Sequence, residues 1–226
     1  MFALDVPNAE SARDLVDQLG DSVRFFKIGL ELFLAGGYFE LIDHLRTRRK
    51  RVFADLKLFD VPETVRRAVT QLVDRGVDFT TVHGNDAILQ AAGSVERDEL
   101  KILAVTVLTS LDRGDLDDLG FACDVEALVL SRARRALEHG CDGVISSGLE
   151  VPKLRASVDS RLLVVCPGIR PVDNRPADDQ KRVVTVQDAF RGGADYIVVG
   201  RPIREAAEPR IAAERIQQQI AEVFSS

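Results

Sequence analysis

Three observations predict that the chain is an α/β protein folded as a single-domain (β/α)8 barrel, also called a TIM barrel. Short apolar runs alternate with longer amphipathic stretches along all 226 residues. The runs are nearly continuous in Val, Ile, Leu and Phe, which is typical of parallel strands buried on both faces. About eight such units give roughly 28 residues per unit, close to the size of a compact barrel.

The expected strands are the short apolar runs. They span Phe2–Asp5, Arg24–Gly29, Val52–Lys57, Phe79–His83, Ile102–Val107, Gly143–Ser146, Leu162–Pro167 and Tyr196–Gly200. A doubly wound open sheet is the alternative topology, and it favours a GxGxxG turn after the first strand. The residues found there, Asp5-Val6-Pro7-Asn8, do not fit such a turn, so the barrel is the favoured topology.

Helical periodicity fills the segments between the strands. The expected helices include Ala9–Leu19, Leu32–Arg48, Pro62–Arg75, Val125–His139 and Ile203–Phe224. Pro62 and Asp124 are typical of helix starts, and Gly20, Gly76 and Gly140 stand where helices should stop. Since no linker or low-complexity tract interrupts the pattern, we expect residues 1–226 to form one domain.

Composition argues against several classes of protein. Thirty basic and 36 acidic residues give a net charge of −6 and a pI near 5.2, which disfavours a nucleic-acid partner. The apolar runs fall short of the roughly 18 residues that a membrane span needs. Met1–Asp5 lacks the features of a secretory leader. Three scattered cysteines without CxxC spacing suit a reducing compartment, so we expect a cytoplasmic protein.

Charged residues gather at the ends of the expected strands, where barrels place their chemistry. Asp55 and Lys57 are two residues apart on one strand, so their side chains should point the same way. A loop can return Asp60 to the same place, and Lys27 on the neighbouring strand can join them. Buried charges are costly unless they pair. This array can act as a general acid and stabilise a carbanion, or it can be a structural salt-bridge network.

A second group of polar residues lies near the end of the chain. Gly200 and Arg201 separate the last expected strand from a helix. The glycine lets backbone approach a ligand, and the helix amides with the guanidinium group can form a phosphate site. The alternative is a helix start that carries a surface arginine. The long connection before this strand carries Arg170 and Gln180, which can close over the same phosphate. Arg182, in contrast, is expected to lie in a solvated loop.

Metal binding is not expected from the sequence. His44, His83 and His139 are scattered, and no Cys, His or Asp spacing matches a zinc site. The basic run 46–51 lies at the end of an expected helix, where cations are favourable, and is interpreted as solvated surface.

The segment Asp55–Val65, which reads DLKLFDVPETV, closely resembles the signature of the orotidine 5′-monophosphate decarboxylase family. The resemblance covers essentially the whole chain. It includes Leu4-Asp5, Lys27–Glu31, Val82-His83, Val105–Ser110, Pro167–Pro171, Asp179–Val183 and Gly200–Ile203. Two departures are Glu63, where the family usually has Asn, and Gly84, where Ala is common.

The resemblance implies a (β/α)8 barrel that works as a homodimer, with active sites at the subunit interface. It implies conversion of orotidine 5′-monophosphate to uridine 5′-monophosphate (UMP) and CO₂, the last step of de novo pyrimidine synthesis, without metal or organic cofactor. Carried over by position, Lys57 is the proton donor, Asp55 lies near the departing carboxylate, and Lys27 pairs with Asp55. Asp60 and Thr64 would come from the partner subunit.

The resemblance also implies how the rest of the nucleotide is held. Asp5 and Lys27 would reach the ribose, and Thr109 would lie near the pyrimidine. Four residues would hold the phosphodianion, namely Arg170, Gln180, Gly200 and Arg201.

Two other functions stay open at this point. One is a Mg²⁺-dependent decarboxylase of a sugar phosphate from the same superfamily, whose members have an acidic residue where Lys27 stands. The other is a non-catalytic barrel that binds a phosphorylated ligand, against which the intact set of Asp55, Lys57 and Asp60 argues.

Overall fold

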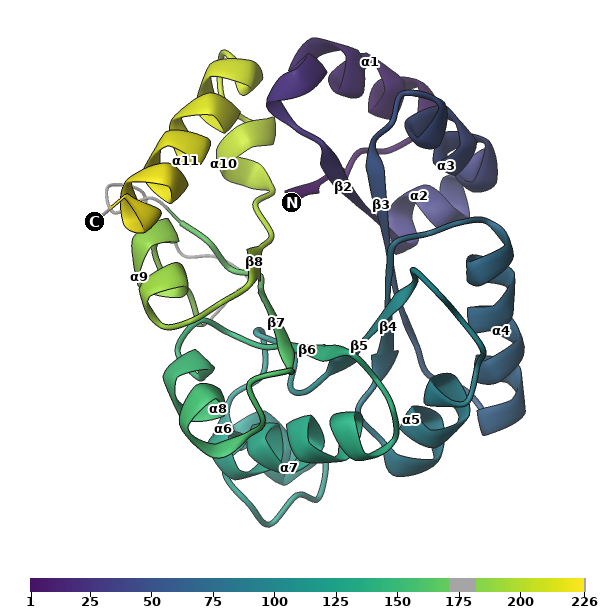
Figure 1. The fold of residues 1–226 in the computed structure, drawn as a ribbon, viewed down its shortest axis with the longest axis vertical. Helices are drawn as coiled ribbons and strands as arrows, with labels where there is room; N and C mark the ends of the chain where they lie inside the picture. Colours follow the sequence, from purple (N-terminus) through teal and green to yellow (C-terminus); the bar gives the residue numbers. More distant parts are fainter. Residues whose placement is uncertain (171–181, 226) are drawn as a thin grey trace.

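The computed structural model describes residues 1–170 and 182–225, which build an eight-stranded parallel sheet curled into a barrel (Figure 1). The strands follow one another in the sheet in chain order, from β1 to β8. A bridge between Phe2 and Val199 joins the two ends of the sheet, and the Ala3 amide donates to the Val199 carbonyl at 2.8 Å. The predicted (β/α)8 barrel is confirmed.

Each strand begins within one residue of its expected start. The bounds are β1 Phe2–Ala3, β2 Phe25–Gly29, β3 Arg51–Leu58, β4 Phe79–His83, β5 Lys101–Val105, β6 Gly143–Ile145, β7 Leu163–Cys166 and β8 Tyr196–Ile197. The strands β1, β5 and β8 end two or three residues earlier than expected. Their last residues leave the sheet and form the rim of the barrel, where Asp5 and Gly200 lie.

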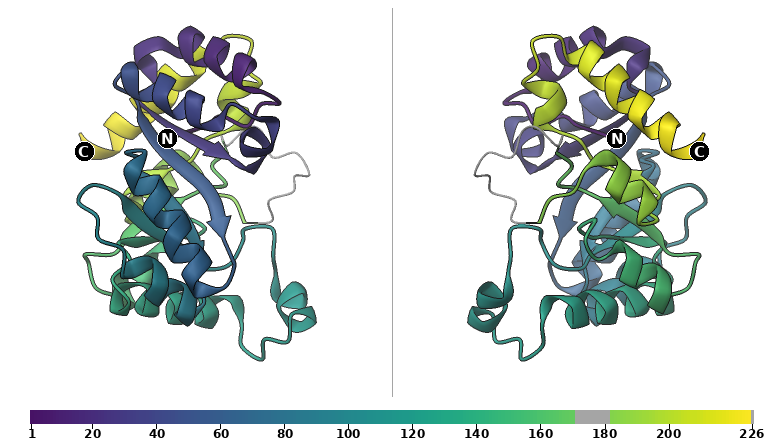
Figure 2. Two further views of the ribbon diagram at one scale, coloured as in Figure 1. Left: turned by 90° about the vertical axis from the view of Figure 1, so that its right-hand side faces the viewer. Right: turned by 90° about the vertical axis from the view of Figure 1, so that its left-hand side faces the viewer.

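Helices surround the sheet (Figure 1), and α6 stands away from the others on the long connection after β5 (Figure 2). The bounds are α1 Ala9–Leu19, α2 Leu30–Ala35, α3 Tyr38–Thr47, α4 Pro62–Asp74, α5 Asp86–Gly93, α6 Arg113–Asp118, α7 Val125–Glu138, α8 Val151–Ser157, α9 Val186–Arg191, α10 Arg201–Arg204 and α11 Pro209–Phe224. None of the helices described here is long and apolar enough to cross a membrane.

Two of the expected helices are wrong as single helices. The segment 32–48 is split between α2 and α3, because Gly36 and Gly37 adopt φ values of 84° and 72° that end one helix before the next begins. The segment 203–224 is split because Pro209 begins a new helix. The expected cap at Asp124 is confirmed, since its carboxylate accepts from the Ala127 amide at 2.7 Å.

The barrel has two apolar layers. The larger lies between the sheet and the helices. The smaller fills the barrel itself and includes Phe25, Phe53, Phe79 and Leu103. Because these residues come from the first halves of their strands, they close the N-terminal end of the barrel. At the C-terminal ends of the strands, polar side chains such as Asp55 and Lys57 stand among apolar ones such as Val105 and Ile145.

Candidate active site

A cavity of about 400 Å³ opens at the C-terminal ends of the strands. Most of the residues singled out from the sequence line it together. They are Asp5, Lys27, Asp55, Lys57, Thr109, Arg170, Gly200 and Arg201. Residues as far apart in sequence as Asp5 and Arg201, which are 196 positions apart, are brought together because parallel strands all end at the same side of a barrel.

An alternating row of charges crosses the floor of this cavity. The Lys27 ammonium lies between two carboxylates, 3.1 Å from Asp5 Oδ1 and 3.4 Å from Asp55 Oδ2. The Lys57 ammonium lies 2.9 Å from the same Asp55 oxygen. The side chains of Lys27 and Asp55 are 13% and 10% exposed, whereas Lys57 is 33% exposed. The inner pair is therefore enclosed, and Lys57 faces the cavity.

The two enclosed members of the row, Asp55 and Lys27, stay charged because opposite charges lie next to them. Burial alone raises the pKa of the Asp55 carboxyl, but Lys27 and Lys57 outweigh burial and hold that pKa below its ordinary value. Burial likewise acts to lower the pKa of Lys27, but the charges of Asp55 and Asp5 raise it above its ordinary value. Both groups are therefore ionised at neutral pH.

The strand that carries Asp55 and Lys57 is not regular, which differs from the expectation. Ala54 pairs with Thr80 and Leu58 with Val82, so the β3–β4 register shifts between them. Within this bulge Lys57 has a φ of 47°, a left-handed conformation that costs an L-residue roughly 1–2 kcal/mol. The two side chains do meet, as predicted, but the bulge rather than strand alternation sets their geometry.

Sequence reasoning missed Thr81 on β4. Its hydroxyl donates to Asp55 Oδ1 and accepts from the Lys57 amide, both at 2.9 Å. The signal in the sequence is a pair of hydroxyl residues, Thr80 and Thr81, inside an otherwise apolar strand between Phe79 and Val82.

Arginines and glycines form the other wall of the cavity. Arg170 and Arg201 were expected there, and Arg204 was missed although it lies one helical turn after Gly200. The Arg204 guanidinium donates to the Asp5 carbonyl at 2.6 Å, which ties α10 to the end of β1. This arginine wall adds positive charge to the cavity that the row of lysines and carboxylates also lines.

The backbone at Gly200 lies close to β1 and to the Asp5 carboxylate. A Cβ built on Gly200 would lie 3.4 Å from the Ala3 Cβ and 3.8 Å from the nearer carboxylate oxygen of Asp5. Any larger side chain there would extend past the Asp5 carboxylate, beside the cavity. Gln180, the remaining residue expected at the phosphate, lies outside the described residues.

The expectation that Arg182 is solvated is wrong. Its side chain is 12% exposed and forms an ion pair with Glu150 at 2.6 Å. It also donates to the carbonyls of Val107 and Leu108, at 3.1 and 2.9 Å. Arg182 therefore connects the segment that follows β5 with the turn that precedes α8. Burial raises the pKa of Glu150, although the adjacent guanidinium opposes that shift.

Asp60 and Thr64 do not line the cavity among the residues that the structure describes. Both are exposed, and Asp60 accepts a hydrogen bond from the Val61 amide at 2.6 Å. Phe59 and Val61, on either side of Asp60, are 66% and 63% exposed. This segment thus presents its apolar and acidic side chains outward.

Fold and cavity together define a (β/α)8-barrel enzyme that places a row of alternating charges beside a wall of arginines. The model of the orotidine 5′-phosphate decarboxylase / HUMPS family matches residues 1–216. The chain belongs to that family.

Named relatives agree with this assignment. An orotidine 5′-phosphate decarboxylase of Methylococcus capsulatus is 66% identical over all of this chain and 93% of its own length. One from Stenotrophomonas maltophilia is 47% identical over 100% of this chain and 94% of its own. The crystal structure of the Lactobacillus acidophilus orotidine 5′-phosphate decarboxylase has a TM-score of 0.84 at 35% identity, covering 96% of each chain.

Proposed function

We propose that this chain decarboxylates orotidine 5′-phosphate with Lys57 as the proton donor to the ring carbon that loses CO₂. The chain is a carboxy-lyase, and its product, UMP, belongs to pyrimidine biosynthesis. The observation that carries the assignment of Lys57 is its position: its ammonium faces the cavity and lies 2.9 Å from Asp55.

The chemistry explains why an ammonium is needed there. When the bond to the carboxylate breaks, its electron pair stays on the ring carbon as an anion with little delocalisation. A fixed ammonium beside that carbon stabilises the developing charge without reorganisation. Lys57 then gives its proton to the same carbon, which forms the C–H bond of UMP. Asp55 holds the ammonium in place through Oδ2.

The arginine wall supports a role in holding the phosphodianion. Arg170, Gly200 and Arg201 line the same cavity as the lysine–aspartate row, and Gly200 lies beside Asp5. The phosphate is remote from the reacting carbon, so its binding energy can be used to assemble the charged row around the substrate. Asp5 and Lys27, between the two regions, would contact the ribose, and Thr109 would contact the pyrimidine.

A Mg²⁺-dependent reaction on a sugar phosphate is disfavoured by Lys27. Its ammonium occupies the space between the Asp5 and Asp55 carboxylates, at 3.1 and 3.4 Å. A divalent cation bound by those oxygens would be repelled by this charge. The same row argues against a barrel that only binds a ligand, since burying these charges is costly without a use for them.

Exposed apolar side chains support a homodimer with shared active sites. Leu30, Phe33 and Leu34 follow β2, and they are 52%, 42% and 81% exposed. Phe59 and Val61, on either side of the exposed Asp60, are exposed as well, and we propose that these five apolar side chains form one dimer surface. In the proposed dimer, each subunit covers this surface on the other and contributes Asp60 and Thr64 to the other's cavity.

We also propose that residues 1–226 act as one domain in the cytoplasm. A single sheet closes through Phe2 and Val199, which supports one domain. Cys123, Cys141 and Cys166 are all free thiols, as suits a reducing compartment.

The test of the proposed function is the loss of orotate absorbance when purified protein meets fresh substrate in the presence of EDTA. We expect full consumption, with UMP as the product. Activity that disappears with EDTA would favour the metal-dependent relative, and no absorbance change at all would favour the non-catalytic barrel.

Shared sites have their own test. Lys57→Ala and Asp60→Ala proteins, each inactive alone, are mixed, unfolded mildly and refolded together. Half of the dimers then carry both changes in one site and none in the other, so about a quarter of the wild-type activity should return. A mixture that stays inactive would place Asp60 in the site of its own subunit, and an Asp60→Ala protein that is active alone would place Asp60 outside any site.

A further inference from the structure

We infer that Thr81 is a positioning residue for the reaction, whose hydroxyl fixes Asp55 and Lys57 together. The inference depends on the proposed roles of those two residues. Thr81 has no exposed surface, and it lies on β4, next to the bulge of β3. It does not line the cavity among the described residues, so its effect would be indirect.

Side-chain direction places Thr81 inside the barrel. Neighbouring residues on a strand point to opposite faces, and Phe79, two residues earlier, belongs to the apolar cluster within the barrel. Val82 belongs to the layer between sheet and helices. Thr81 therefore shares the inner face with Asp55, and Thr80 shares the outer face with Val82.

The hydroxyl of Thr81 both accepts and donates a hydrogen bond to residues at the bulge of β3. It accepts from the Lys57 amide, which the bulge has taken out of the regular strand ladder. It donates to Asp55 Oδ1, which leaves Oδ2 to accept from the Lys57 ammonium. One oxygen thus fixes the backbone of the proposed proton donor and the rotamer of its carboxylate partner.

A left-handed residue inside a strand persists only where its surroundings hold it. Lys57 has such a conformation, and the Thr81 hydroxyl is the group that satisfies its amide. Removing the hydroxyl leaves the partly buried Lys57 amide without this partner and frees the Asp55 carboxylate to rotate. We expect both changes to move the Lys57 ammonium relative to the substrate.

The test compares Thr81→Val with Thr80→Val. The two threonines are adjacent, and both are 0% exposed. The hydroxyl of each donates a hydrogen bond to a residue of β3. Thr80 donates to the Ala54 carbonyl at 3.1 Å, and among the described residues its hydroxyl forms no hydrogen bond with Asp55 or Lys57. Thr80→Val is thus a matched control that removes a buried hydroxyl of the same type.

We expect Thr81→Val to lower kcat about 10- to 100-fold, the scale of a misplacement near 1 Å, while KM and the Kd of UMP change little. Thr80→Val should keep the wild-type kcat and show a similar loss of Tm. Thr81→Ser, which keeps the hydroxyl, should recover most of the rate.

The inference is overturned if Thr81→Val keeps the wild-type kcat, or if both valine variants lose kcat equally. Should Thr81→Val fail to fold, Thr81→Cys replaces it, because a thiol is a poor hydrogen-bonding group of similar size. Equal rates for Thr81→Cys and Thr81→Ser would then overturn the inference. Wild-type protein that does not consume orotidine 5′-phosphate would contradict the proposed function instead.

Discussion

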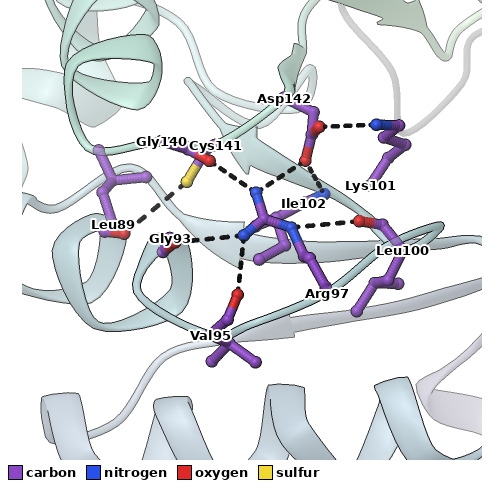
Figure 3. A network of polar contacts seen from close by, with 10 residues as sticks. All are labelled: Leu89, Gly93, Val95, Arg97, Leu100, Lys101, Ile102, Gly140, Cys141 and Asp142. Atoms are coloured by element: carbon purple, nitrogen blue, oxygen red, sulfur yellow. Dashed lines mark hydrogen bonds and ion pairs between the residues drawn. The ribbon is translucent and has the colours of Figure 1, made fainter.

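The two ends of the barrel use buried charges in different ways. At the C-terminal end, Lys27, Asp55 and Lys57 pair with one another and face a cavity. At the N-terminal end, acidic side chains bind the backbone and arginines. Figure 3 shows one such network, in which Asp142 accepts from Arg97, Lys101 and the Ile102 amide.

The N-terminal network is repeated around the barrel. Three aspartates stand just before β4, β6 and β8, each two residues after a glycine. Each accepts from a backbone amide near the start of the preceding strand and from an arginine: Asp78 from Val52 and Arg51, Asp142 from Ile102 and Arg97, Asp195 from Val164 and Arg155.

Aromatic side chains close the barrel above these networks. The ring centroids of Phe25 and Tyr196 lie 5.1 and 5.3 Å from that of Phe79. The Arg51 guanidinium lies over Phe25 at 4.3 Å. The three aspartates at this end have fixed protein partners, so they stabilise the fold. Charges at the other end have a cavity beside them, so a substrate can exchange contacts with them.

The largest expected effect tests the C-terminal end. Lys57→Ala should lower kcat by about 10⁴-fold or more, because it removes both the proton donor and a preorganised charge. UMP should still bind, since the role proposed for Lys57 is in the chemical step. Turnover is measured by orotate absorbance and the Kd of UMP by calorimetry. Arg97→Met, at the opposite end, is the control and should keep the wild-type kcat in the folded protein.

The next-largest effect is a loss of stability expected at the N-terminal end of the barrel. Phe79→Ala should destabilise the protein by about 3–5 kcal/mol, because it empties the centre of the aromatic cluster. The free energy of unfolding in urea measures this loss. KM for the substrate should stay unchanged in the fraction that remains folded. A large change in KM would show that the two ends are not separable.

A smaller effect is expected at the arginine wall. Arg201→Ala should raise KM by about 10- to 150-fold. This range corresponds to the loss of one hydrogen bond to a charged group, which contributes roughly 1.5–3 kcal/mol to binding. Added phosphite dianion should restore part of the lost rate. If KM does not change, the phosphate lies elsewhere in the cavity.

The smallest effect is a pH dependence of stability. Lys27 and Lys57 lower the pKa of Asp55 despite burial, so ionised Asp55 stabilises the folded state above its unfolded pKa of about 3.9. That stability is lost as pH falls through the lower, folded pKa. The pKa of Lys27 is raised, so its contribution is lost only as pH rises above about 10.4.

Thermal unfolding from pH 2 to 9 checks this dependence. The difference in Tm between wild type and Asp55→Asn should be constant from about pH 5 to 9 and shrink below pH 4. A step near neutral pH would mean that the charged row titrates there, against the expectation.

The two ends also differ in how much the sequence predicts. The strands can be predicted because each one is a short run of Val, Ile and Phe, and such a run indicates a buried strand without reference to the rest of the chain. Most of the cavity residues followed, because the ends of parallel strands must meet. The bulge at Lys57, the role of Thr81 and the buried Arg182 depend on cross-strand register and on contacts between distant segments. The break between α2 and α3 was missed because helical periodicity continues across Gly36 and Gly37.

The central claim is that an ammonium held at position 57 is the group that drives the reaction. Lys57→Cys, treated with bromoethylamine, regains a side chain that ends in an ammonium at nearly the original length. Position 57 is one-third exposed, so the reagent can reach it. We expect this treatment to restore a large part of the lost kcat, whereas iodoacetamide, which adds a neutral amide, should restore none. Equal recovery with both reagents, or a Lys57→Cys protein that turns over at the wild-type rate before treatment, would contradict the account.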